Sequence, residues 1–594
     1  MKISDRLHAV PSRTTCLHHY PAEIRKEVKG ISIPSSPNED WIDHLPTTGW
    51  SPGNGCEIKN WPIPLATYSS SLQDLDWFKD EPDEENSFAL HRFIWLLRWL
   101  SQVPSRADLL SADRTILDWI EKVGPARNSL AWRTYSVSER VVNWLVFLCA
   151  TKNHRNLDSK MAGTIGASLF EHLKHIMTHL EYYGKSYNNH ILNNARALYV
   201  GGRFLHLPQV AHLGKILFQK CIPRLVDEEG SLLEGSTHYQ LLLTRTLVEV
   251  LWAAKASGDS DFALWAEKEA SSMISCCLYL GGTSLDNTVD SFPCIGDISP
   301  DYPVSWFYPH PDYRQEPESW QKLWDATTVS SLLKEKAGQK KLIGGLKQWK
   351  WVRTSRGTLR ALIHTPQLLG LYPAAHGHLD FGGFLLNDAE GPVLVDRGRI
   401  SYHPDAYGIY GFSARAHNTT LINGFPIIPD CRGIFSGYSE YLSHGSEVGI
   451  YDRGFDKIIS WRTNALERFG KDIKWCRDLV IKRDQIESLE TILNPRGVAI
   501  NSESYIHWAP GWTIVNNMEN DSDDFLIGKT GRVYRLKIEM MLGEDGAVEF
   551  YEGTPNSLEG WQIPDYGARV PALTMRMSVR STHDYSVRFL LCPV

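Results

Sequence analysis

Hydrophobic positions recur about every 3.6 residues over much of the first half of the chain, a spacing typical of helices. The clearest example is the series Ile165, Leu169, Leu173, Ile176 and Leu180, whose members fall on one helical face. Four other stretches are also predicted as helices, and the first two are apolar almost all round, which indicates burial on every side. They span residues 87–100, 140–150, 241–254 and 262–278.

Beyond residue 341 the period of the apolar positions falls from about 3.6 to about 2, which is typical of strands. The change follows a charged, glycine-containing stretch, 334–341, which we interpret as a linker. Short turn-forming sequences separate the predicted strands. These strands span residues 358–364, 384–387, 392–396, 419–423, 458–461, 478–482, 533–539 and 585–591.

A block of helices followed by a block of antiparallel strands predicts two packed units, one all-α and one a β-sandwich. We place the helical domain at residues 71–335 and the antiparallel β-sandwich domain at 336–594. Residues 1–70 are rich in Pro, Ser, Asn and Trp and are weakly periodic, so we expect an extended N-terminal segment packed on the helical domain.

The composition is that of an ordinary globular protein, with 42% hydrophobic and 22% charged residues among 594. It excludes a disordered chain, a collagen and a coiled-coil rod. The net charge of −7 and the lack of a long basic run give no reason to expect nucleic-acid binding. The aromatic content of 11% fits large cores, and it also fits a carbohydrate groove lined by rings.

The beginning of the chain shows no apolar stretch of the kind that a signal peptide needs. We therefore expect a cytoplasmic location, although export by another route stays open. No run of roughly 18 apolar residues occurs, so we expect no membrane span. The ten cysteines include no CxxC pair, which favours reduced thiols over a disulfide framework.

The first candidate cluster is an Asn-Asn-His step where a new helix is expected to begin. Asn188, Asn189 and His190 come shortly after a helix that is expected to end near Tyr183, and Asn is a favourable N-cap residue. At a helix start these side chains can direct amide and imidazole donors toward one spot. Plain helix capping explains the same residues.

The second cluster is a polar loop, 227–239, that runs into the predicted helix at 241. Glu234, His238 and Tyr239 lie near the helix start. Tyr239 is either a half-buried packing residue or a general base whose pKa is lowered by neighbouring cations.

The third cluster places His376 and His378 on the same side of an extended chain, because side chains two residues apart share a face. The predicted hairpin 384–396 returns Asp396 to the end of the sheet at which the two histidines enter. Arg415 and His417 precede the next predicted strand. Two histidines and a carboxylate would suit zinc, while polar loop residues that bond to the backbone are the alternative.

Six short motifs occur in an order that resembles the heparinase II/III-like polysaccharide lyases. The resemblance covers roughly residues 85–430 and extends more loosely to the end of the chain. The motifs are Asn-Asn-His (188–190), Glu-Gly-Ser-x-x-Tyr (234–239), Ile-Gly-Asp (295–297), His-Gly-His-x-Asp (376–380), Val-Asp-x-Gly (395–398) and Arg-Ala-His-Asn (415–418). The resemblance implies an incomplete (α/α) toroid followed by an antiparallel β-sandwich.

It also implies an activity, the β-elimination of acidic polysaccharides or oligosaccharides that contain uronic acid. Asn189 and His190 match the pair that neutralises the uronate carboxylate. Tyr239 matches the tyrosine that serves as base and acid, and His376 matches the base for the opposite C5 epimer. Positions 193 and 194 are both Asn, whereas many members of the family carry an acidic residue shortly after the Asn-His step.

The resemblance assigns metal binding to His378, Asp396 and His417, with zinc as the expected ion and a role in ordering the cleft. We expect no organic cofactor. The remaining polar residues near the motifs are candidates for substrate contact: Asn188, Glu234, Tyr402 and Arg415. The sequence leaves the oligomeric state open, and a homodimer is one assembly compatible with it.

Two other classes of function compete with a lyase. A glycoside hydrolase on an (α/α) toroid would need two carboxylates on either side of the scissile bond, for which Glu234, Asp297 and Asp380 are available. A non-catalytic glycan-binding protein of polysaccharide biosynthesis would not need the hydroxyl of Tyr239.

Overall fold

The computed structural model describes residues 20–53, 75–155, 157–182, 187–281, 292–302, 304, 323, 351–364, 375–430, 446–517, 523–543 and 546–594. The chain divides into two compact units, which we call the helical unit and the strand unit. The helical unit comprises Met1–Leu232, Gln240–Cys276 and Ser299–Gln339, and the strand unit comprises Leu233–Tyr239, Cys277–Ile298 and Lys340–Val594. Two short segments from the helical half of the sequence thus pack with the strands, and one of them carries Tyr239.

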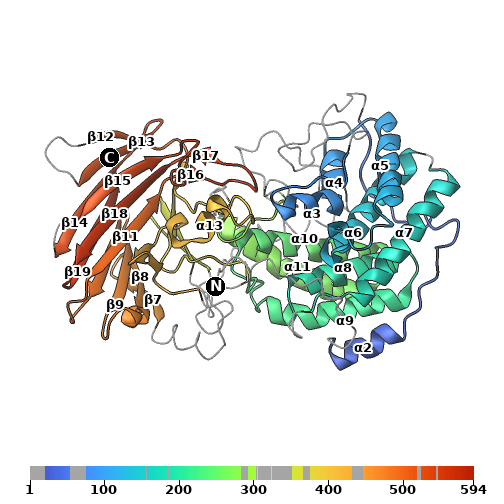
Figure 1. The fold of residues 1–594 in the computed structure, drawn as a ribbon, viewed down its shortest axis with the longest axis horizontal. Coiled ribbons are helices and arrows are strands. Elements are labelled where there is room, and N and C mark those ends of the chain that lie inside the picture. The colour runs from blue at the N-terminus through green and yellow to red at the C-terminus, as the bar shows by residue number, and fades with distance from the viewer. Residues whose placement is uncertain are drawn as a thin grey trace. The chain divides into compact units, whose positions relative to one another are not determined.

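Helices run through the first half of the chain, drawn in blue to green in Figure 1. The predicted helices at 140–150, 165–180, 241–254 and 262–278 are confirmed by α6, α7, α10 and α11, although α7 ends at Thr178, two residues before the predicted end. The described helices of this half are α2 (Ala22–Lys29), α3 (Glu84–Arg92), α4 (Ile94–Ser101), α5 (Leu109–Lys122), α6 (Thr134–Thr151), α7 (Ser159–Thr178), α8 (Asn189–Phe204), α9 (Pro208–Leu225), α10 (Thr237–Ala256) and α11 (Ser260–Gly281). The short helix α13 (Ala406–Phe412) belongs to the strand unit. Single 3-10 turns lie at Arg106–Asp108, Leu130–Trp132 and Lys152–His154.

Helix α6 lies at the centre of the helical unit, and nearly all of its residues are buried. It packs against α3, α4, α7 and α8, which explains why its sequence is apolar on every side. Helix α7 is capped at its N-terminus by Asp158, whose side chain accepts a hydrogen bond from the N–H of Met161. Helix α9, which begins with Pro208, was not predicted, although proline is common at a first helical position.

The predicted helix at 87–100 is instead two helices, α3 and α4, separated by Phe93. This residue has a φ of 61°, in the left-handed region that ends one helix before the next begins. Its ring centroid lies 5.1 Å from Trp95 and 5.3 Å from Trp144. Aromatic packing therefore stabilises a break that the continuous apolar pattern of the sequence conceals.

The described part of the N-terminal segment contains one helix, α2, that was not predicted. The segment is attached to α7 by hydrogen bonds from two aromatic side chains. The hydroxyl of Tyr20 donates to the carbonyl of Met177 at 3.1 Å, and the indole of Trp41 donates to the carbonyl of Ala162 at 3.2 Å.

The strand unit is built of antiparallel sheets, drawn in yellow to red in Figure 1. A four-stranded sheet has the order β1-β2-β3-β4, an eight-stranded sheet β12-β13-β14-β19-β10-β9-β8-β7, a five-stranded sheet β15-β18-β11-β5-β6, and β16 pairs with β17. The first eight strands are β1 (Trp351–Arg356), β2 (Leu359–His364), β3 (Phe384–Asp388), β4 (Gly391–Leu394), β5 (Thr420–Ile422), β6 (Phe425–Pro426), β7 (Glu447–Arg453) and β8 (Asp456–Thr463). The others are β9 (Lys474–Ile481), β10 (Ile486–Leu493), β11 (Ile500–His507), β12 (Thr513–Asn517), β13 (Asp524–Lys529), β14 (Arg532–Leu542), β15 (Ala547–Glu552), β16 (Trp561–Gln562), β17 (Val570–Pro571), β18 (Leu573–Ser581) and β19 (Tyr585–Pro593).

The eight-stranded and five-stranded sheets share one hydrophobic core, as expected of a β-sandwich. Strand β10 shows why the period is 2, because its residues alternate between buried and partly exposed positions. Each of the eight predicted strands is confirmed within one or a few residues of its predicted bounds.

Strand β11 supports the loops that carry the third cluster. The N–H of Val395 donates to the carbonyl of His507, and the N–H of Tyr505 donates to the carbonyl of Thr419, both at 2.9 Å. The chain after β4 and the chain before β5 are therefore held at the same end of one strand. This arrangement brings Asp396 and His417 together.

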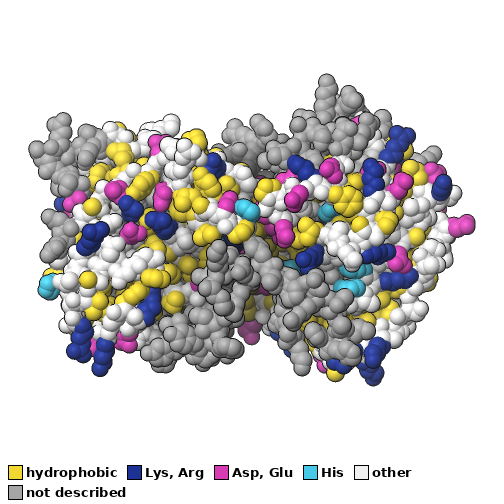
Figure 2. Space-filling view, viewed as in Figure 1, with side chains coloured by type: hydrophobic (Ala, Val, Ile, Leu, Met, Phe, Trp, Pro, Cys, Tyr) yellow, Lys and Arg dark blue, Asp and Glu magenta, His cyan; other side chains and the backbone are white. Residues whose placement is uncertain are grey.

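Positive and negative side chains are interspersed among the described residues on the face drawn in Figure 2. This distribution agrees with the small net charge of −7. In the part of the chain that the structure describes, no helix has the length and apolarity needed to cross a membrane.

Candidate functional site

Tyr239 and His376 lie ring against ring within the strand unit. Their ring centroids are 3.6 Å apart and their planes differ by 16°. Tyr239 belongs to the first turn of α10, where its N–H donates to Oγ of Ser236 at 3.1 Å. Backbone hydrogen bonds of 2.9 Å link His376 to both Glu234 and Asp297. Three segments distant in sequence thus hold the phenol and the imidazole in contact.

Asp297 is the centre of the polar contacts around His376. Its carboxylate accepts hydrogen bonds from Nδ1 of His376 at 3.1 Å, from Nε2 of His378 at 3.0 Å and from Nη1 of Arg399 at 2.8 Å. Burial by itself would raise the pKa of Asp297, but Arg399 and the two imidazoles hold it well below its usual value. The ionised carboxylate fixes the orientation of His376, whose Nε2 lies 3.7 Å from Oε2 of Glu234.

The glycine that precedes Asp297 is required by this close packing. Gly296 has a φ of +80°, which L side chains rarely adopt. A Cβ atom here would lie 2.6 Å from the carbonyl oxygen of His376 and 2.7 Å from that of Gly235. The Ile-Gly-Asp motif therefore has a steric cause.

Tyr402 brings a second phenol to Tyr239, with 3.1 Å between the two hydroxyl oxygens. The guanidinium carbon of Arg399 lies 4.5 Å from the centroid of the Tyr402 ring. Burial, followed by the nearby charge of Asp297 and by Tyr239, raises the pKa of Tyr402 well above its usual value, against the opposite effect of Arg399. Glu234 and Tyr402, both predicted as substrate-binding residues, thus contact the predicted catalytic residues.

Asn189 and His190 lie in the helical unit, at the start of α8. The predicted helix start is confirmed, since the side chain of Asn188 accepts a hydrogen bond from the N–H of Ile191 at 3.0 Å. Asn189 is buried, and a third of the His190 side chain is exposed. The ring of His190 lies 4.8 Å from that of Tyr135.

A carboxylate that the sequence analysis did not consider orients His190. Oε1 of Glu181 lies 3.1 Å from Nδ1 of His190, and its Oε2 accepts from Nδ2 of Asn194 at 3.1 Å. The same asparagine accepts the backbone N–H of Glu181. An acid located before the Asn-His step therefore contacts His190, while residue 194 holds that acid in place. No spacing rule connects residues 181 and 190, because they do not belong to one helix.

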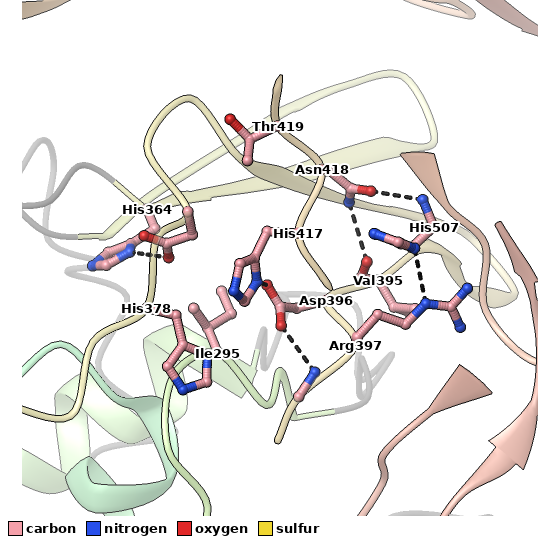
Figure 3. Close-up of polar contacts among 12 residues, drawn as sticks. Ile295, His364, His378, Val395, Asp396, Arg397, His417, Asn418, Thr419 and His507 are labelled. Carbon is pink, nitrogen blue, oxygen red and sulfur yellow. Dashed lines mark hydrogen bonds and ion pairs between the residues drawn. The ribbon is translucent and has the colours of Figure 1, made fainter. Parts of the chain in front are cut away.

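Two of the three predicted metal ligands are bonded to each other (Figure 3). Nδ1 of His417 lies 2.7 Å from Oδ2 of Asp396, whose Oδ1 accepts from the N–H of Gly398 at 2.9 Å. Burial would lower the pKa of His417, but Asp396 raises it above its usual value. The ring of His378 lies 5.2 Å from that of His417, centroid to centroid.

The donor types fit zinc, since two imidazoles and a carboxylate are common zinc ligands. Nδ1 of His378 and Nε2 of His417 are buried and make no hydrogen bond of good geometry. Both oxygens of Asp396, however, are engaged in the contacts just described. Among the described residues no group of three or more His, Cys, Asp or Glu side chains is arranged to hold a metal ion. Zinc binding therefore stays a prediction.

Arg415 and Asn418 of the Arg-Ala-His-Asn motif have different surroundings. Nε of Arg415 donates to the hydroxyl of Tyr505 at 3.2 Å. The side chain of Asn418 donates to the carbonyl of Val395 at 3.1 Å and accepts the N–H of His507 at 2.7 Å (Figure 3). The asparagine thus joins two loops to β11, a structural role that the motif alone did not reveal.

Comparisons with known proteins identify the fold. No protein-family model matches the chain, and no curated protein matches its sequence. Several solved structures do resemble it over 96% of its length. A heparinase III superposes with a TM-score of 0.64 at 12% identity and is covered over 86% of its chain.

Two further structures agree with this result. A mutant of heparan sulfate lyase HepC from Pedobacter heparinus has a TM-score of 0.57 at 13% identity, with 87% of its chain covered. A heparinase III gene product has a TM-score of 0.56 at 16% identity, with 85% of its chain covered. At these identities the likeness concerns architecture, and it matches the change from helices to antiparallel sheets seen here. The chain therefore has the heparinase-like polysaccharide lyase fold, an α/α toroid followed by an antiparallel β-sandwich.

Proposed function

We propose that this protein is a polysaccharide lyase that cleaves uronic-acid-containing glycans by β-elimination. The observation that supports it best is the contact between the phenol of Tyr239 and the imidazole of His376, with Asp297 bonded to the imidazole. A phenol and an imidazole are both side-chain groups that can act in general acid–base catalysis. Solved structures with a similar fold are named heparinase III and heparan sulfate lyase. Their names favour an acidic polysaccharide, such as a glycosaminoglycan, as the substrate of this chain.

In the proposed reaction a base removes the proton from C5 of the uronic acid. The electron pair of the C5–H bond forms the C4=C5 double bond, and the bond between C4 and its oxygen breaks. The leaving oxygen keeps that bond's electron pair and takes a proton. Tyr239 serves as base and then as acid when proton and leaving group lie on one face of the ring. His376 serves as base for the opposite C5 epimer, and its contact with Asp297 holds Nδ1 as a donor so that Nε2 can accept.

The C5 proton is weakly acidic, so the adjacent carboxylate must be neutralised in the transition state. Each well-placed donor can contribute about 3 kcal/mol to such stabilisation. We assign this role to the side chains of Asn189 and His190, following the resemblance to the lyases. The contact between Glu181 and His190 supports the assignment, because a carboxylate on Nδ1 fixes the orientation of the ring.

A zinc ion belongs to the proposal as a structural element. His378, Asp396 and His417 would hold it, and it would order the loop that carries His376. The proton transfers themselves are assigned to this chain's tyrosine and histidine.

A glycoside hydrolase is the competing proposal, and two of its three candidate carboxylates, Asp297 and Asp380, disfavour it. A hydrolase needs one carboxylic acid that is protonated near neutral pH. Asp297 has a pKa held well below its usual value, for the reasons given above. Burial would raise the pKa of Asp380, but His364 lowers it below its usual value. Both carboxylates are therefore ionised and bonded to imidazoles.

The test is absorbance in the near ultraviolet, which the new C4=C5 double bond produces. The full chain is incubated with a panel of uronic-acid glycans that includes heparan sulfate, chondroitin sulfate and alginate. We expect absorbance with at least one member, and loss of turnover without loss of glycan binding in Tyr239→Phe. New reducing ends without absorbance would instead indicate a hydrolase. Glycan binding without any cleavage would indicate a non-catalytic glycan-binding protein.

A further inference from the structure

The two phenols at the candidate site are joined by a direct hydrogen bond. The hydroxyl oxygens of Tyr239 and Tyr402 lie 3.1 Å apart, although the residues are 163 positions apart in the sequence. Tyr239 belongs to the segment Leu233–Tyr239 and Tyr402 to the loop after β4, and both are parts of the strand unit. Geometry alone allows either hydroxyl to be the donor.

The surroundings of Tyr402 favour this residue as the donor. Tyr402 lies near the ionised carboxylate of Asp297, and burial together with that charge raises its pKa well above the usual value. Arg399, over the Tyr402 ring, acts in the opposite sense without reversing the result. Tyr402 therefore keeps its proton.

We propose that Tyr402 is a positioning residue that donates a hydrogen bond to the oxygen of Tyr239 and stabilises its phenolate. The inference rests on the proposed lyase function and deepens it. A hydrogen bond to a charged form favours that form, so the donor increases the fraction of Tyr239 that can accept the C5 proton. Tyr402 exchanges no proton itself. The proton moves from C5 to Tyr239 and from there to the leaving oxygen.

The ring of Tyr402 is held independently of its hydroxyl. The ring of Tyr566 stacks on it with centroids 5.9 Å apart, and the N–H of Tyr402 donates to the hydroxyl of Tyr566 at 3.0 Å. Arg399 also covers the ring. Removing the hydroxyl alone, as in Tyr402→Phe, thus leaves the packing of the loop in place and isolates the hydrogen bond.

Several charged and titratable groups surround the pair and must be considered in any pH experiment. His376 stacks on Tyr239, and the ring of His238 lies 6.5 Å from it. Glu234 lies beside His376, while Asp297 and Arg399 face Tyr402. All of these groups remain in Tyr402→Phe, so a comparison between matched variants cancels their contributions.

The first measurement needs no substrate. The absorbance of phenolate is followed during pH titration of four full-length proteins: wild type, Tyr239→Phe, Tyr402→Phe and the double variant. Wild type minus Tyr239→Phe reports the ionisation of Tyr239 beside Tyr402. The difference in absorbance between Tyr402→Phe and the double variant reports the ionisation of Tyr239 in the absence of the Tyr402 hydroxyl. We expect the midpoint to move upward by about one pH unit when Tyr402 is lost. An unmoved or lowered midpoint would overturn the inference, whatever the activity of the protein.

The second measurement uses the glycan that gives absorbance with the wild type. We expect Tyr402→Phe to lower kcat about tenfold at neutral pH, to change KM less than twofold, and to recover as the pH rises. Tyr407→Phe makes the same chemical change at a hydroxyl that bonds the carbonyl of Pro555, and should match the wild type. A loss that is equal at every pH, or no loss, would contradict the proposed role. Absence of wild-type absorbance on every glycan would count against the lyase function, and the titration would still decide the inference.

Discussion

Glu181 and His190 are joined by a contact of 3.1 Å between Oε1 of the carboxylate and Nδ1 of the imidazole. The acid precedes the histidine by nine residues and is held by Asn194 on its other oxygen. A hydrogen bond on one ring nitrogen decides which nitrogen faces a substrate. Within the helical unit, Glu181 thus orients His190, the histidine that we assign to the substrate carboxylate.

Glu181→Gln is expected to lower kcat/KM about tenfold, because the amide keeps the size of the side chain but removes the charge beside the imidazole. The measurement is initial rate against substrate concentration, with circular dichroism as a check of folding. Glu171→Gln is the matched control, since Glu171 pairs with Lys174 and is 42% exposed. Equal kcat/KM for the wild type and Glu181→Gln would show that this carboxylate has no influence on the reaction.

His91 is expected to make the stability of the helical unit depend on pH. Its Nδ1 accepts a hydrogen bond from the indole of Trp119 at 3.1 Å, which requires a neutral ring. Burial, and then the charge of Arg140, lower the pKa of His91 to about 3. The unfolded chain therefore binds a proton that the folded chain does not, so stability is complete above the unfolded pKa and falls as the pH falls.

We expect the free energy of unfolding to drop by about 2 kcal/mol between about pH 7.5 and about pH 5, relative to His91→Gln. Denaturant titrations of the two proteins at several pH values measure the difference, in which other titrating groups cancel. Parallel pH profiles for the wild type and the variant would mean that His91 is protonated in the folded state.

The strand unit contains a buried ion pair whose loss should be costly. Glu490 is fully buried and accepts hydrogen bonds from Arg477 at 2.5 Å and from Thr420 at 2.7 Å. Glu490→Ala leaves the charge of Arg477 without its partner, so we expect a loss of about 3–5 kcal/mol in the free energy of unfolding.

The control for this prediction is an exposed pair in the same unit. Nη2 of Arg496 lies 3.0 Å from Oδ2 of Asp472, and the two side chains are 57% and 45% exposed. Arg496→Ala should change the free energy of unfolding by less than about 0.5 kcal/mol. Denaturation followed by tryptophan fluorescence compares the two variants, and similar losses in both would refute the argument from burial.

Zinc binding is tested directly by elemental analysis of the purified chain after exposure to zinc and removal of the excess. We expect about one zinc ion per chain, and loss of the ion in His378→Ala. His583→Ala, a change at an exposed histidine, should retain the metal. If neither the wild type nor the variants hold zinc, the bond between His417 and Asp396 is the stable state of these residues.

Much of the fold was predictable because periodicity depends only on neighbouring residues. The apolar spacing of α7 and the alternation in β10 arise from burying one face of a single element. The same reasoning failed at Phe93, where the ring of Trp144 from α6 packs against Phe93 and stabilises a break within a continuous apolar stretch. The N-cap at Asn188 was predictable because its side chain bonds to the N–H of Ile191, within the same helical turn.

For the candidate site, the sequence predicted which residues have suitable chemistry but not which of them are in contact. The sequence motifs include Tyr239 and His376, but the distance between these residues in the sequence did not show that their rings would stack. Asp297 was considered for hydrolysis, yet its three bonds to His376, His378 and Arg399 assign it to orientation and charge balance. No motif in the sequence includes Glu181, which contacts His190 only in the folded chain.

Local pattern therefore specified which segments are helices or strands and which side chains are suited to proton transfer, because each of those properties resides in a short stretch of chain. The partners of those side chains were decided by folding. Asp297 meets His376 across 79 residues and Tyr402 meets Tyr239 across 163, distances at which sequence spacing carries no information about contact. Their orientation and pKa follow from burial and neighbouring charge, which exist only once the chain has packed.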